Sequence, residues 1–527
     1  MTILSVEGLT VALPQGADRP LAVDQASLEL RQGEILCIVG ESGSGKSALS
    51  GAIMGAPAPG LKVVAGSVRL GDQELTGLSE REWCRIRGRR IAMIFQEPMA
   101  ALNPAIPVAA QIMEVFELHA RMSHAERHER ALALIRAMQL PDPERIAASY
   151  PHQLSGGQCQ RVIIAMALAM SPEVLIADEP TTALDVTTQA QVLKLIRELR
   201  TAHGHAILFI THDFGVVAEI ADRIAVMRHG RIVEMGAARR VLTQPEHPYT
   251  RELLAAVPSL VPPASPEPVA AADSPSHPVL TVTGLQKKYG RVRAVNEISF
   301  DLERGTTLSI VGESGCGKSS LARLIVRLAE PTAGRVEVNG KCFLSLRGRE
   351  LRASCRAVQM IFQDPFGSLN PLRRVGAVIA RAAVLAGADR RTARDRATEL
   401  IDRVGLPREA LDRRPAAFSG GQKQRIGIAR ALAMNPDVLI ADESLSALDA
   451  SSQAQILELL RKLQKELGLA ILLITHDLRV AAQISQRIAV MQGGRIVEIG
   501  SAEQVINSPG HPYTRELLES APGRGLV

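Results

Sequence analysis

The 527-residue sequence lacks any long uninterrupted hydrophobic run. Hydrophobic residues make up 46% of the chain, but they come in short stretches. None of these stretches reaches the ~18 consecutive apolar residues that a membrane-spanning helix requires. The first residues, Met1 to Glu7, contain no basic segment followed by an apolar one, so we expect no secretory signal. These absences predict a protein that stays in the cytosol.

Cysteines and aromatic residues are also scarce. The six cysteines show no CxxC or other metal-ligand spacing, so we expect neither disulfides nor a metal cluster. Only 3% of the residues are aromatic, which argues against the stacking platforms of single-stranded nucleic-acid binders. The net charge of +6 is modest for this length. We therefore expect the arginines between Arg81 and Arg90 to form a solvated helix face rather than a nucleic-acid groove.

The chain does contain a set of short motifs that occurs twice in the same order. A glycine-rich motif opens each copy, as Gly40, Glu41, Ser42, Gly43, Ser44, Gly45, Lys46 and Ser47 and as Gly312, Glu313, Ser314, Gly315, Cys316, Gly317, Lys318 and Ser319. Later motifs repeat at a constant distance of 264 residues, as Asp178 and Asp442 do. This spacing indicates an internal tandem duplication, and a chain of this length suits two cores better than one.

Proline divides the two copies. Residues 258–278 are rich in proline, which blocks both helix and central strand, so this stretch predicts an extended linker between domains at 1–257 and 279–527. In each domain, short apolar runs such as 34–40 and 307–312 are typical of buried strands in a parallel sheet. The predicted fold is α/β, with helices over 125–138 and 392–404 in a helical insertion and apolar hairpins over 224–234 and 488–498.

The glycine-rich motif follows a predicted strand and opens a helix, which is the context of a phosphate-binding loop. Its glycines let successive backbone N–H groups converge on phosphate oxygens, and the helix N-terminus adds a partial positive charge. We expect Lys46 and Lys318 to reach the β- and γ-phosphates, and Ser47 and Ser319 to ligate Mg²⁺. The motif therefore predicts that ATP and Mg²⁺ bind in both copies.

Acidic residues follow a buried apolar run in each copy. Asp178 and Asp442 are predicted to hold the Mg²⁺ shell, while Glu179 and Glu443 orient and polarise the attacking water. A single Asp-Glu pair of this kind is more often the end of a strand than a catalytic pair. Its register with a phosphate-binding loop favours catalysis here.

Two further polar residues recur in each copy. Gln96 and Gln363 carry a neutral amide that can bind both Mg²⁺ and water, and His212 and His476 each end a strand where they could contact the γ-phosphate. Isolated glutamines and histidines of this kind are usually surface or structural residues. We assign them catalytic roles because both copies match.

A second glycine motif opens another helix in each copy, as Ser155, Gly156, Gly157 and Gln158 and as Ser419, Gly420, Gly421 and Gln422. A hydroxyl and two glycines at a helix start form a second anion-binding N-terminus, which a single phosphate-binding loop does not need. With Leu154 or Phe418 in front of it, this segment resembles the signature of the ATP-binding-cassette (ABC) family. The resemblance covers nearly the whole chain outside the linker.

This resemblance implies two P-loop NTPase cassettes in tandem, each with a RecA-like α/β core, an antiparallel β subdomain and a helical subdomain. It also implies internal head-to-tail pairing, in which Lys46 shares a nucleotide with Ser419 and Lys318 shares one with Ser155. The proline-rich linker would then supply the partner cassette at high effective concentration.

The second copy and the first differ at two places where the family has a common pattern. The resemblance implies that Tyr289 stacks on adenine, but the first copy has Leu13 at that position, so we expect the first site to hold nucleotide less tightly. After Glu443 the second copy reads Ser444-Leu445, where the first copy has the more usual proline and threonine. Because Glu443 itself is present, both sites are predicted to be catalytic.

The segments His247-Pro248-Tyr249-Thr250 and His511-Pro512-Tyr513-Thr514 narrow the resemblance to the oligopeptide/dipeptide/nickel importer subfamily, whose fused members import oligopeptides, glutathione and microcin C. This implies an ATP-hydrolysing subunit at the cytoplasmic face of the inner membrane. Its implied partners are two integral-membrane permease subunits and a periplasmic or extracellular solute-binding protein. Permease helices are expected to insert beside 97–104 and 364–371.

The alternative is a soluble tandem-cassette ATPase that acts on ribosomes or nucleic acid. Such ribosomal factors usually have a long charged helical linker, and DNA-repair cassettes carry zinc modules or coiled coils. The linker of this chain is proline-rich instead, and the two tails favour import.

Overall fold

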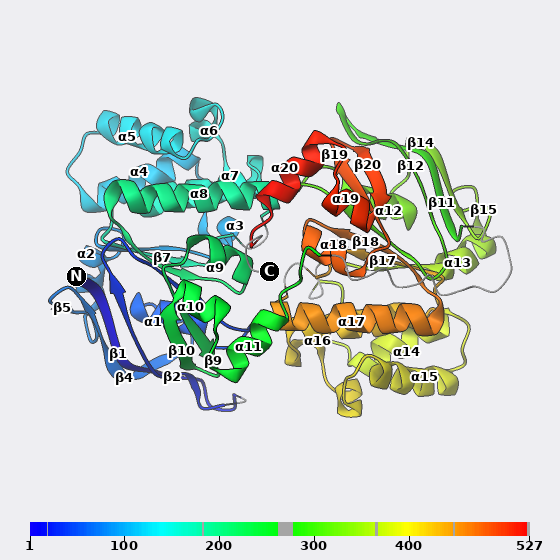
Figure 1. Ribbon diagram of the computed structural model, residues 1–527, viewed down its shortest axis with the longest axis horizontal. Coiled ribbons are helices and arrows are strands. Elements are labelled where there is room, and N and C mark those ends of the chain that lie inside the picture. Colours follow the sequence, from blue (N-terminus) through cyan, green and yellow to red (C-terminus); the bar gives the residue numbers. More distant parts are fainter. Residues whose placement is uncertain (18, 182–183, 262–277, 364–366, 446–447, 524–527) are drawn as a thin grey trace. The chain divides into compact units, whose positions relative to one another are not determined.

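The computed structural model describes residues 1–17, 19–181, 184–261, 278–363, 367–445 and 448–523. They form two compact units (Figure 1), the first containing Met1–Leu184 and Thr188–Val257 and the second containing Pro258–Ala521. Most of the predicted linker lies outside the described residues, at 262–277. Residues 364–366, in the segment expected to receive a permease helix, also lie outside them.

A four-stranded antiparallel sheet forms one layer of the first unit, with the strand order β2-β1-β4-β5. Its strands are β1 (Thr2–Ala12), β2 (Leu21–Arg31), β4 (Lys62–Leu70) and β5 (Gln73–Glu74). Leu4 and Val6 of β1 are buried while Glu7 is exposed, as expected for a sheet with one face on a core. That core also receives Leu36 and Ile38 from the neighbouring sheet, so the two sheets pack as one body.

A six-stranded sheet positions the polar motifs of the first unit, in the order β10-β9-β3-β8-β7-β6. Its strands are β3 (Ile35–Val39), β6 (Ile91–Ile94), β7 (Val174–Asp178), β8 (Ala206–Ile210), β9 (Arg223–Arg228) and β10 (Arg231–Ala237). All pairs are parallel except the β9–β10 hairpin, which the sequence predicted. Because parallel strands end at the same edge, the residues that follow β3, β7 and β8 are brought together there.

Helices flank this sheet and form the insertion between β6 and β7. They are α1 (Lys46–Ile53), α2 (Glu80–Ile86), α3 (Pro98–Ala101), α4 (Val108–His119), α5 (His124–Ala137), α6 (Pro143–Ala148), α7 (Gly156–Leu168), α8 (Val186–His203), α9 (Phe214–Ile220), α10 (Ala238–Thr243) and α11 (Pro248–Ala255). Helix α5 matches the helix predicted over 125–138. It begins after Ser123, whose side-chain oxygen accepts the N–H of Glu126 at 3.3 Å.

The arginines between Arg81 and Arg90 do not all form the expected solvated helix face. Helix α2 ends at Ile86, so Arg87 and Arg90 lie beyond it. Arg87 donates to the main-chain oxygens of Met54 at 2.9 Å and Gly55 at 2.7 Å. Arg90 forms an ion pair with a glutamate 83 residues away in the sequence. The prediction was wrong for these two because tertiary partners, which the local charge pattern does not specify, hold them.

The second unit repeats the arrangement, with sheets ordered β12-β11-β14-β15 and β16-β17-β18-β13-β19-β20. Its strands are β11 (Leu280–Tyr289), β12 (Val292–Leu302), β13 (Thr307–Val311), β14 (Ala333–Val338), β15 (Lys341–Cys342), β16 (Val358–Ile361), β17 (Val438–Asp442), β18 (Ala470–Thr475), β19 (Arg487–Gln492) and β20 (Arg495–Ser501). The hairpin predicted over 488–498 is formed by β19 and β20.

The α-helices described in the second unit follow the order of their counterparts in the first unit, which has α3 and α6 in addition. They are α12 (Lys318–Ile325), α13 (Gly348–Ala357), α14 (Val375–Leu385), α15 (Arg390–Arg403), α16 (Gly420–Leu432), α17 (Ala450–Leu467), α18 (Leu478–Ile484), α19 (Ala502–Asn507) and α20 (Pro512–Ser520). Helix α15 corresponds to the helix predicted over 392–404. Throughout the part of the chain that the structure describes, we find no helix with the length and apolar character needed to cross a membrane.

Candidate active site

The glycine-rich loop of each unit joins a buried strand to a helix, β3 to α1 and β13 to α12. Gly45 and Gly317 have left-handed φ angles of 108° and 109°. A Cβ atom at Gly45 would lie 2.3 Å from the main-chain oxygen of Ala22, and one at Gly317 would lie 2.0 Å from that of Ala294. Only glycine fits either position. Backbone crowding therefore explains why a glycine directly precedes each loop lysine.

The lysine of each loop is buried inside the loop that carries it. Lys46 donates to the main-chain oxygens of Gly40 at 2.8 Å and Glu41 at 2.9 Å. Lys318 makes the same two bonds in the second unit, both at 2.7 Å, to Gly312 and Glu313. The remaining tip residues of the loops are exposed: Ser42, Gly43, Ser314 and Gly315. Each loop therefore presents an ammonium group beside a solvent-accessible turn, which suits an anionic ligand.

A buried hydroxyl in the first loop indicates that the loop fits phosphate. The side-chain oxygen of Ser44 is buried and has no hydrogen-bond partner among the described residues. Such a group is costly to leave unpaired, and a phosphate oxygen could accept its hydrogen. Cys316 takes this place in the second loop, with its sulfur 3.9 Å from Nζ of Lys318. Burial raises the pKa of the Cys316 thiol, so it stays neutral beside the lysine.

A carboxylate meets a loop hydroxyl in each unit. The side chain of Ser47 donates to Asp178 at 3.3 Å, and that of Ser319 donates to Asp442 at 3.0 Å. Burial raises the pKa of both aspartates, and the serine hydrogen bonds only partly offset this effect. A cation would restore the balance of charge, and carboxylate with hydroxyl oxygen is the ligand chemistry that Mg²⁺ prefers. The residues present therefore fit Mg²⁺.

Glu179 and Glu443 follow these aspartates in a strained backbone conformation. Their φ angles of 47° and 42° lie in the left-handed region, which costs ~1 to 3 kcal/mol for a non-glycine residue and is concentrated at functional sites. The side-chain amide of Gln96 donates to Glu179 at 2.9 Å, and that of Gln363 donates to Glu443 at 2.8 Å. In each unit the structure thus brings the predicted glutamine and glutamate into direct contact.

The histidines also lie beside these glutamates, but at different distances. Nδ1 of His212 is 3.2 Å from Glu179, whereas Nδ1 of His476 is 4.0 Å from Glu443. Nζ of Lys318 also lies 3.6 Å from Glu443. Burial lowers the pKa of His212, but the hydrogen bond and negative charge of Glu179 outweigh it and raise the pKa above its ordinary value.

The Ser-Gly-Gly-Gln segments open α7 and α16, as predicted. Ser155 caps α7 by accepting the N–H of Gln158 at 3.3 Å, and the Gln158 side chain accepts the N–H of Ser155 at 3.0 Å. Ser419 and Gln422 make the same two bonds at the start of α16.

Both serines are exposed, and so is Gly156, while Gly157, Gly420 and Gly421 are partly buried. A Cβ atom at Gly157 would lie 2.4 Å from the Thr188 side chain. Gly157 therefore permits close packing against Thr188, and each segment presents a capped helix N-terminus to its surroundings.

The two units differ in the hairpin that precedes the loop. Tyr289 ends β11 and pairs with Val292 across a two-residue turn, and the residue is 49% exposed. Leu13 occupies the equivalent register, with its N–H bonded to Pro20, but it opens a longer connection over residues 13–20. Arg19 in this connection donates to the main-chain oxygen of Gly43 in the phosphate-binding loop. The first unit therefore has an arginine at its loop and no aromatic ring in the hairpin position.

Three contacts of the site were not anticipated from the sequence. Besides Arg19, the Ser50 hydroxyl donates to Asp178 at 3.3 Å, and the phenol oxygens of Tyr249 and Tyr513 accept N–H groups of the two loops. The repetition of the His-Pro-Tyr-Thr segment was a signal for the tyrosines, since it marks a residue kept in both copies. Nothing in the local sequence marks Arg19 or Ser50, because their partners are 24 and 128 residues away.

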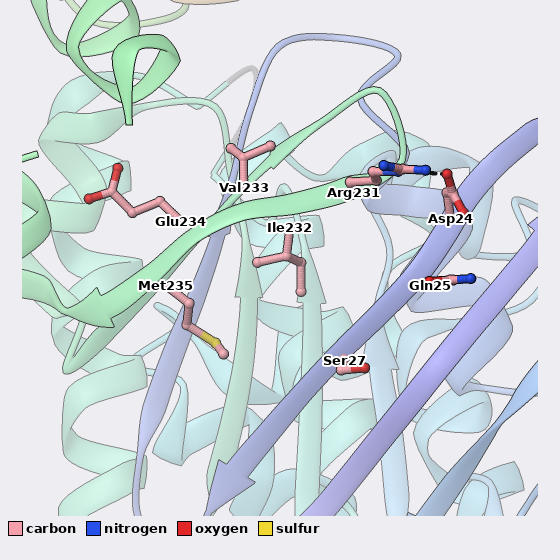
Figure 2. A pocket seen from close by; sticks show the side chains of 8 residues that line it. All are labelled: Asp24, Gln25, Ser27, Arg231, Ile232, Val233, Glu234 and Met235. Carbon is pink, nitrogen blue, oxygen red and sulfur yellow. Dashed lines mark hydrogen bonds and ion pairs between the residues drawn. The ribbon is translucent and has the colours of Figure 1, made fainter. Parts of the chain in front are cut away.

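A separate hollow of about 420 Å³ lies between β2 and β10 of the first unit (Figure 2). Asp24 and Arg231 form an ion pair of 2.6 Å at one side of it, and Met235 and Ile232 contribute apolar surface. None of the residues that line it belongs to the predicted nucleotide site.

Comparisons with known proteins agree with this geometry. The family model described as ABC transporter matches residues 23–182 and 295–446. The model described as oligopeptide/dipeptide transporter, C-terminal region, matches residues 233–278 and 497–524. This chain therefore belongs to the ABC transporter family, and it is an ATPase with two cassettes of the P-loop NTPase fold.

Particular relatives share nearly the whole chain. Glutathione import ATP-binding protein GsiA of Salmonella typhimurium is 45% identical over 561 residues, which cover 99% of this chain and 89% of the relative. GsiA of Escherichia coli strain K12 is 45% identical over 564 residues with the same coverage, and that of Pectobacterium atrosepticum is 44% identical. A solved dimeric structure of a bacterial ABC transporter cassette is 30% identical, covers 45% of this chain and 99% of its own, and has a TM-score of 0.42.

Proposed function

We propose that this chain is the energy-coupling ATPase of an importer for glutathione or related short peptides. The observation that carries the proposal is the 45% identity to glutathione import ATP-binding proteins over 99% of the chain. The transporter C-terminal region in both halves supports the same class of solute. Two permease subunits and a solute-binding protein complete the transporter, and the chain acts at the cytoplasmic face of the membrane.

In this proposal the lysine and the amides of each loop bind the phosphates of ATP. Mg²⁺ would be held by Ser47, Asp178 and Gln96 in the first site and by Ser319, Asp442 and Gln363 in the second, and it would neutralise phosphate charge there. Glu179 and Glu443 orient the attacking water. The side-chain amides of Gln96 and Gln363 each donate to one oxygen of the neighbouring glutamate, at 2.9 Å and 2.8 Å. This hydrogen bond restricts the rotation of the carboxylate, so its other oxygen is held in one orientation.

His212 and His476 lie 3.2 Å and 4.0 Å from the glutamate of their own site and are proposed to contact the γ-phosphate. A contact of this kind is favourable in the transition state, where negative charge is spread over the phosphoryl oxygens. Glu179 raises the pKa of His212, which favours the protonated imidazole and supports this role in the first site.

The two cassettes are proposed to pair head to tail, so that each site combines one loop with the other Ser-Gly-Gly-Gln segment. The test uses a chain in which Glu443→Gln silences the second catalytic glutamate. In that background the remaining hydrolysis depends on Glu179, so Ser419→Ala should remove most of it. The matched change Ser155→Ala should leave it largely unchanged. The reverse result would show that each segment serves the loop of its own cassette.

Docking to the membrane is proposed to come from protein contacts at the segments after Gln96 and Gln363. Met99 in α3 is 48% exposed, which supports a contact there. Met99→Ala should impair uptake more than basal ATP hydrolysis. Cell fractionation should place the chain at the membrane only when the adjacent permease genes are present. Membrane retention without them, or stable co-sedimentation with ribosomes, would contradict the importer.

Uptake of labelled glutathione and of a labelled dipeptide tests the solute. A strain without this gene should lose uptake of at least one of them, and the intact gene should restore it. The Glu179→Gln, Glu443→Gln double variant should fail to restore it although the protein is produced. Normal uptake of both solutes in the deletion strain would contradict this solute class.

A further inference from the structure

The C-terminal helix of each unit reaches the phosphate-binding loop of the same unit. The phenol oxygen of Tyr249 in α11 accepts the N–H of Glu41 at 3.2 Å, and that of Tyr513 in α20 accepts the N–H of Glu313 at 3.2 Å. Both tyrosines are buried. Two copies that have diverged elsewhere in the site have kept the same contact at the same distance, which indicates a selected role for it.

The residue whose N–H binds the tyrosine also accepts a hydrogen bond from the loop lysine. The main-chain oxygen of Glu41 accepts Lys46 at 2.9 Å, and that of Glu313 accepts Lys318 at 2.7 Å. The tyrosine therefore holds this loop residue through its N–H while the lysine contacts its carbonyl oxygen. Because the phenol accepts an amide N–H at the start of the loop, it leaves the later amides of the loop available to a phosphate.

The tail segment itself is fixed to the sheet by a glutamate of the hairpin strand. The carboxylate of Glu234 in β10 accepts the N–H of Glu246 at 2.9 Å and that of His247 at 3.1 Å. Figure 2 shows this carboxylate pointing away from the ion pair of Asp24 and Arg231.

The second unit has the same anchor. Glu498 in β20 accepts the N–H of Gly510 at 2.7 Å and that of His511 at 3.1 Å. In both units the imidazole Nδ1 of the tail histidine then accepts the N–H of the tyrosine, at 3.1 Å in the first unit and 3.2 Å in the second. A continuous chain of hydrogen bonds thus links the hairpin strand, the tail and the loop.

The two tyrosine rings have different neighbours, so the role of the hydroxyl can be distinguished from the role of the ring. The guanidinium of Arg228 lies 4.5 Å from the centroid of the Tyr249 ring, while Gln492 stands at the corresponding place in the second unit. Burial raises the pKa of Tyr249 to about 12, so its phenol keeps its proton at neutral pH. The contact common to both units is the bond from the loop amide to the phenol oxygen.

We propose that Tyr249 and Tyr513 are positioning residues for ATP binding, each holding the phosphate-binding loop of its own unit through its phenol oxygen. The inference rests on the proposed function only in that the loops bind ATP. Through its tyrosine, the His-Pro-Tyr-Thr segment of each transporter-type tail then raises the affinity of the nucleotide site for ATP.

The test measures ATP affinity at one site at a time, using the full chain with Lys318→Ala to remove the second site. In that background Tyr249→Phe, which keeps the ring and deletes only the hydroxyl, should weaken ATP binding about 2- to 10-fold, the range expected for one hydrogen bond. Tyr513→Phe in the same background should leave the affinity unchanged. In the otherwise wild-type chain, each phenylalanine variant should raise KM for ATP with little change in kcat.

A control on the same helix separates positioning from packing. Leu253 is buried in α11, four residues after Tyr249, and its side chain has no polar atom that could bind the loop. Leu253→Val should lower the thermal stability and leave ATP affinity unchanged. If Tyr249→Phe lowers only the thermal stability, or if Leu253→Val weakens ATP binding equally, the positioning role is wrong. Failure of the parent chain to bind ATP would instead contradict the proposed function.

Discussion

The two nucleotide sites agree closely in their phosphate-binding backbone and differ in the groups around it. Gly45 and Gly317 have φ angles one degree apart, and both lysines are buried against the same pair of loop carbonyls. In contrast, the hairpin residue is Leu13 in one unit and Tyr289 in the other. Phosphate geometry constrains the backbone in three dimensions, so that part tolerates little change. Contacts to a base rest on single side chains, which can be exchanged more easily.

The proposed catalytic carboxylates show a second, smaller difference. Glu179 lies 3.2 Å from His212, whereas Glu443 lies 4.0 Å from His476. Asp178 also receives a hydrogen bond from Ser50, where the second unit has Ala322. A duplicated chain can therefore keep the same carboxylates while the groups around them diverge. The comparison predicts unequal sites that both hydrolyse ATP.

The largest expected effect comes from removing both catalytic carboxylates. The Glu179→Gln, Glu443→Gln double variant should lower steady-state ATP hydrolysis about 10²- to 10⁴-fold, since the water is no longer oriented by a carboxylate. ATP binding should persist because the loops are unchanged. Each single variant should keep partial activity, and the two residual rates measure how unequal the sites are. Full activity in the double variant would show that neither glutamate acts in catalysis.

The hairpin residue should produce the next largest effect. Base–aromatic stacking is worth ~1 to 3 kcal/mol in single-stranded nucleic-acid binding, so Tyr289→Ala should cost the second site a comparable amount. Leu13→Ala should cost the first site less, and Leu13→Tyr should strengthen it. A titration with a fluorescent ATP analogue distinguishes these cases. Equal losses at the two sites would show that Leu13 and Tyr289 do not have different roles.

Arg19 should have a smaller effect, confined to the first site. Its hydrogen bond to the Gly43 oxygen places a positive charge at the phosphate-binding loop, so Arg19→Ala should weaken ATP binding by about 1 kcal/mol. The loss should shrink at high salt because exposed charges are screened. Arg291→Ala, in the tip of the second hairpin, is the matched control. If both changes act alike, the contact of Arg19 with the loop has no specific role.

The pH response of the His212–Glu179 pair should be the smallest effect. Because the pKa of His212 is raised in the folded chain, the pair stabilises the fold fully below the unfolded pKa of about 6.5. This contribution should disappear as the pH rises through the raised folded value. The difference in melting temperature between the wild type and His212→Gln should therefore narrow with increasing pH. His476→Gln keeps the pair and should retain the wild-type trend, whereas a pH-independent difference for His212→Gln would contradict it.

Much of this protein could be predicted from its sequence. The repeated motifs predicted an α/β fold with two P-loop NTPase cassettes and ATPase activity, and the His-Pro-Tyr-Thr segments predicted the transporter subfamily. These features are local, since a glycine loop or a capped helix start is encoded by a few consecutive residues. The sequence also predicted that Leu13 corresponds to Tyr289, because equivalent positions in a tandem duplication can be aligned directly.

Other features depended on contacts between residues far apart in the chain. Arg87 and Arg90 do not lie on the expected helix face, because Arg87 binds main-chain oxygens and Arg90 pairs with a distant glutamate. The hydrogen bond between Tyr249 and Glu41 joins residues that are 208 positions apart in the sequence. The hydrogen bond from Arg19 to Gly43 joins a hairpin to the phosphate-binding loop. The chemical groups and the local turns that present them are encoded by short stretches of consecutive residues. Which groups contact one another depends on the packing of the whole sheet, so those contacts became visible only in the folded chain.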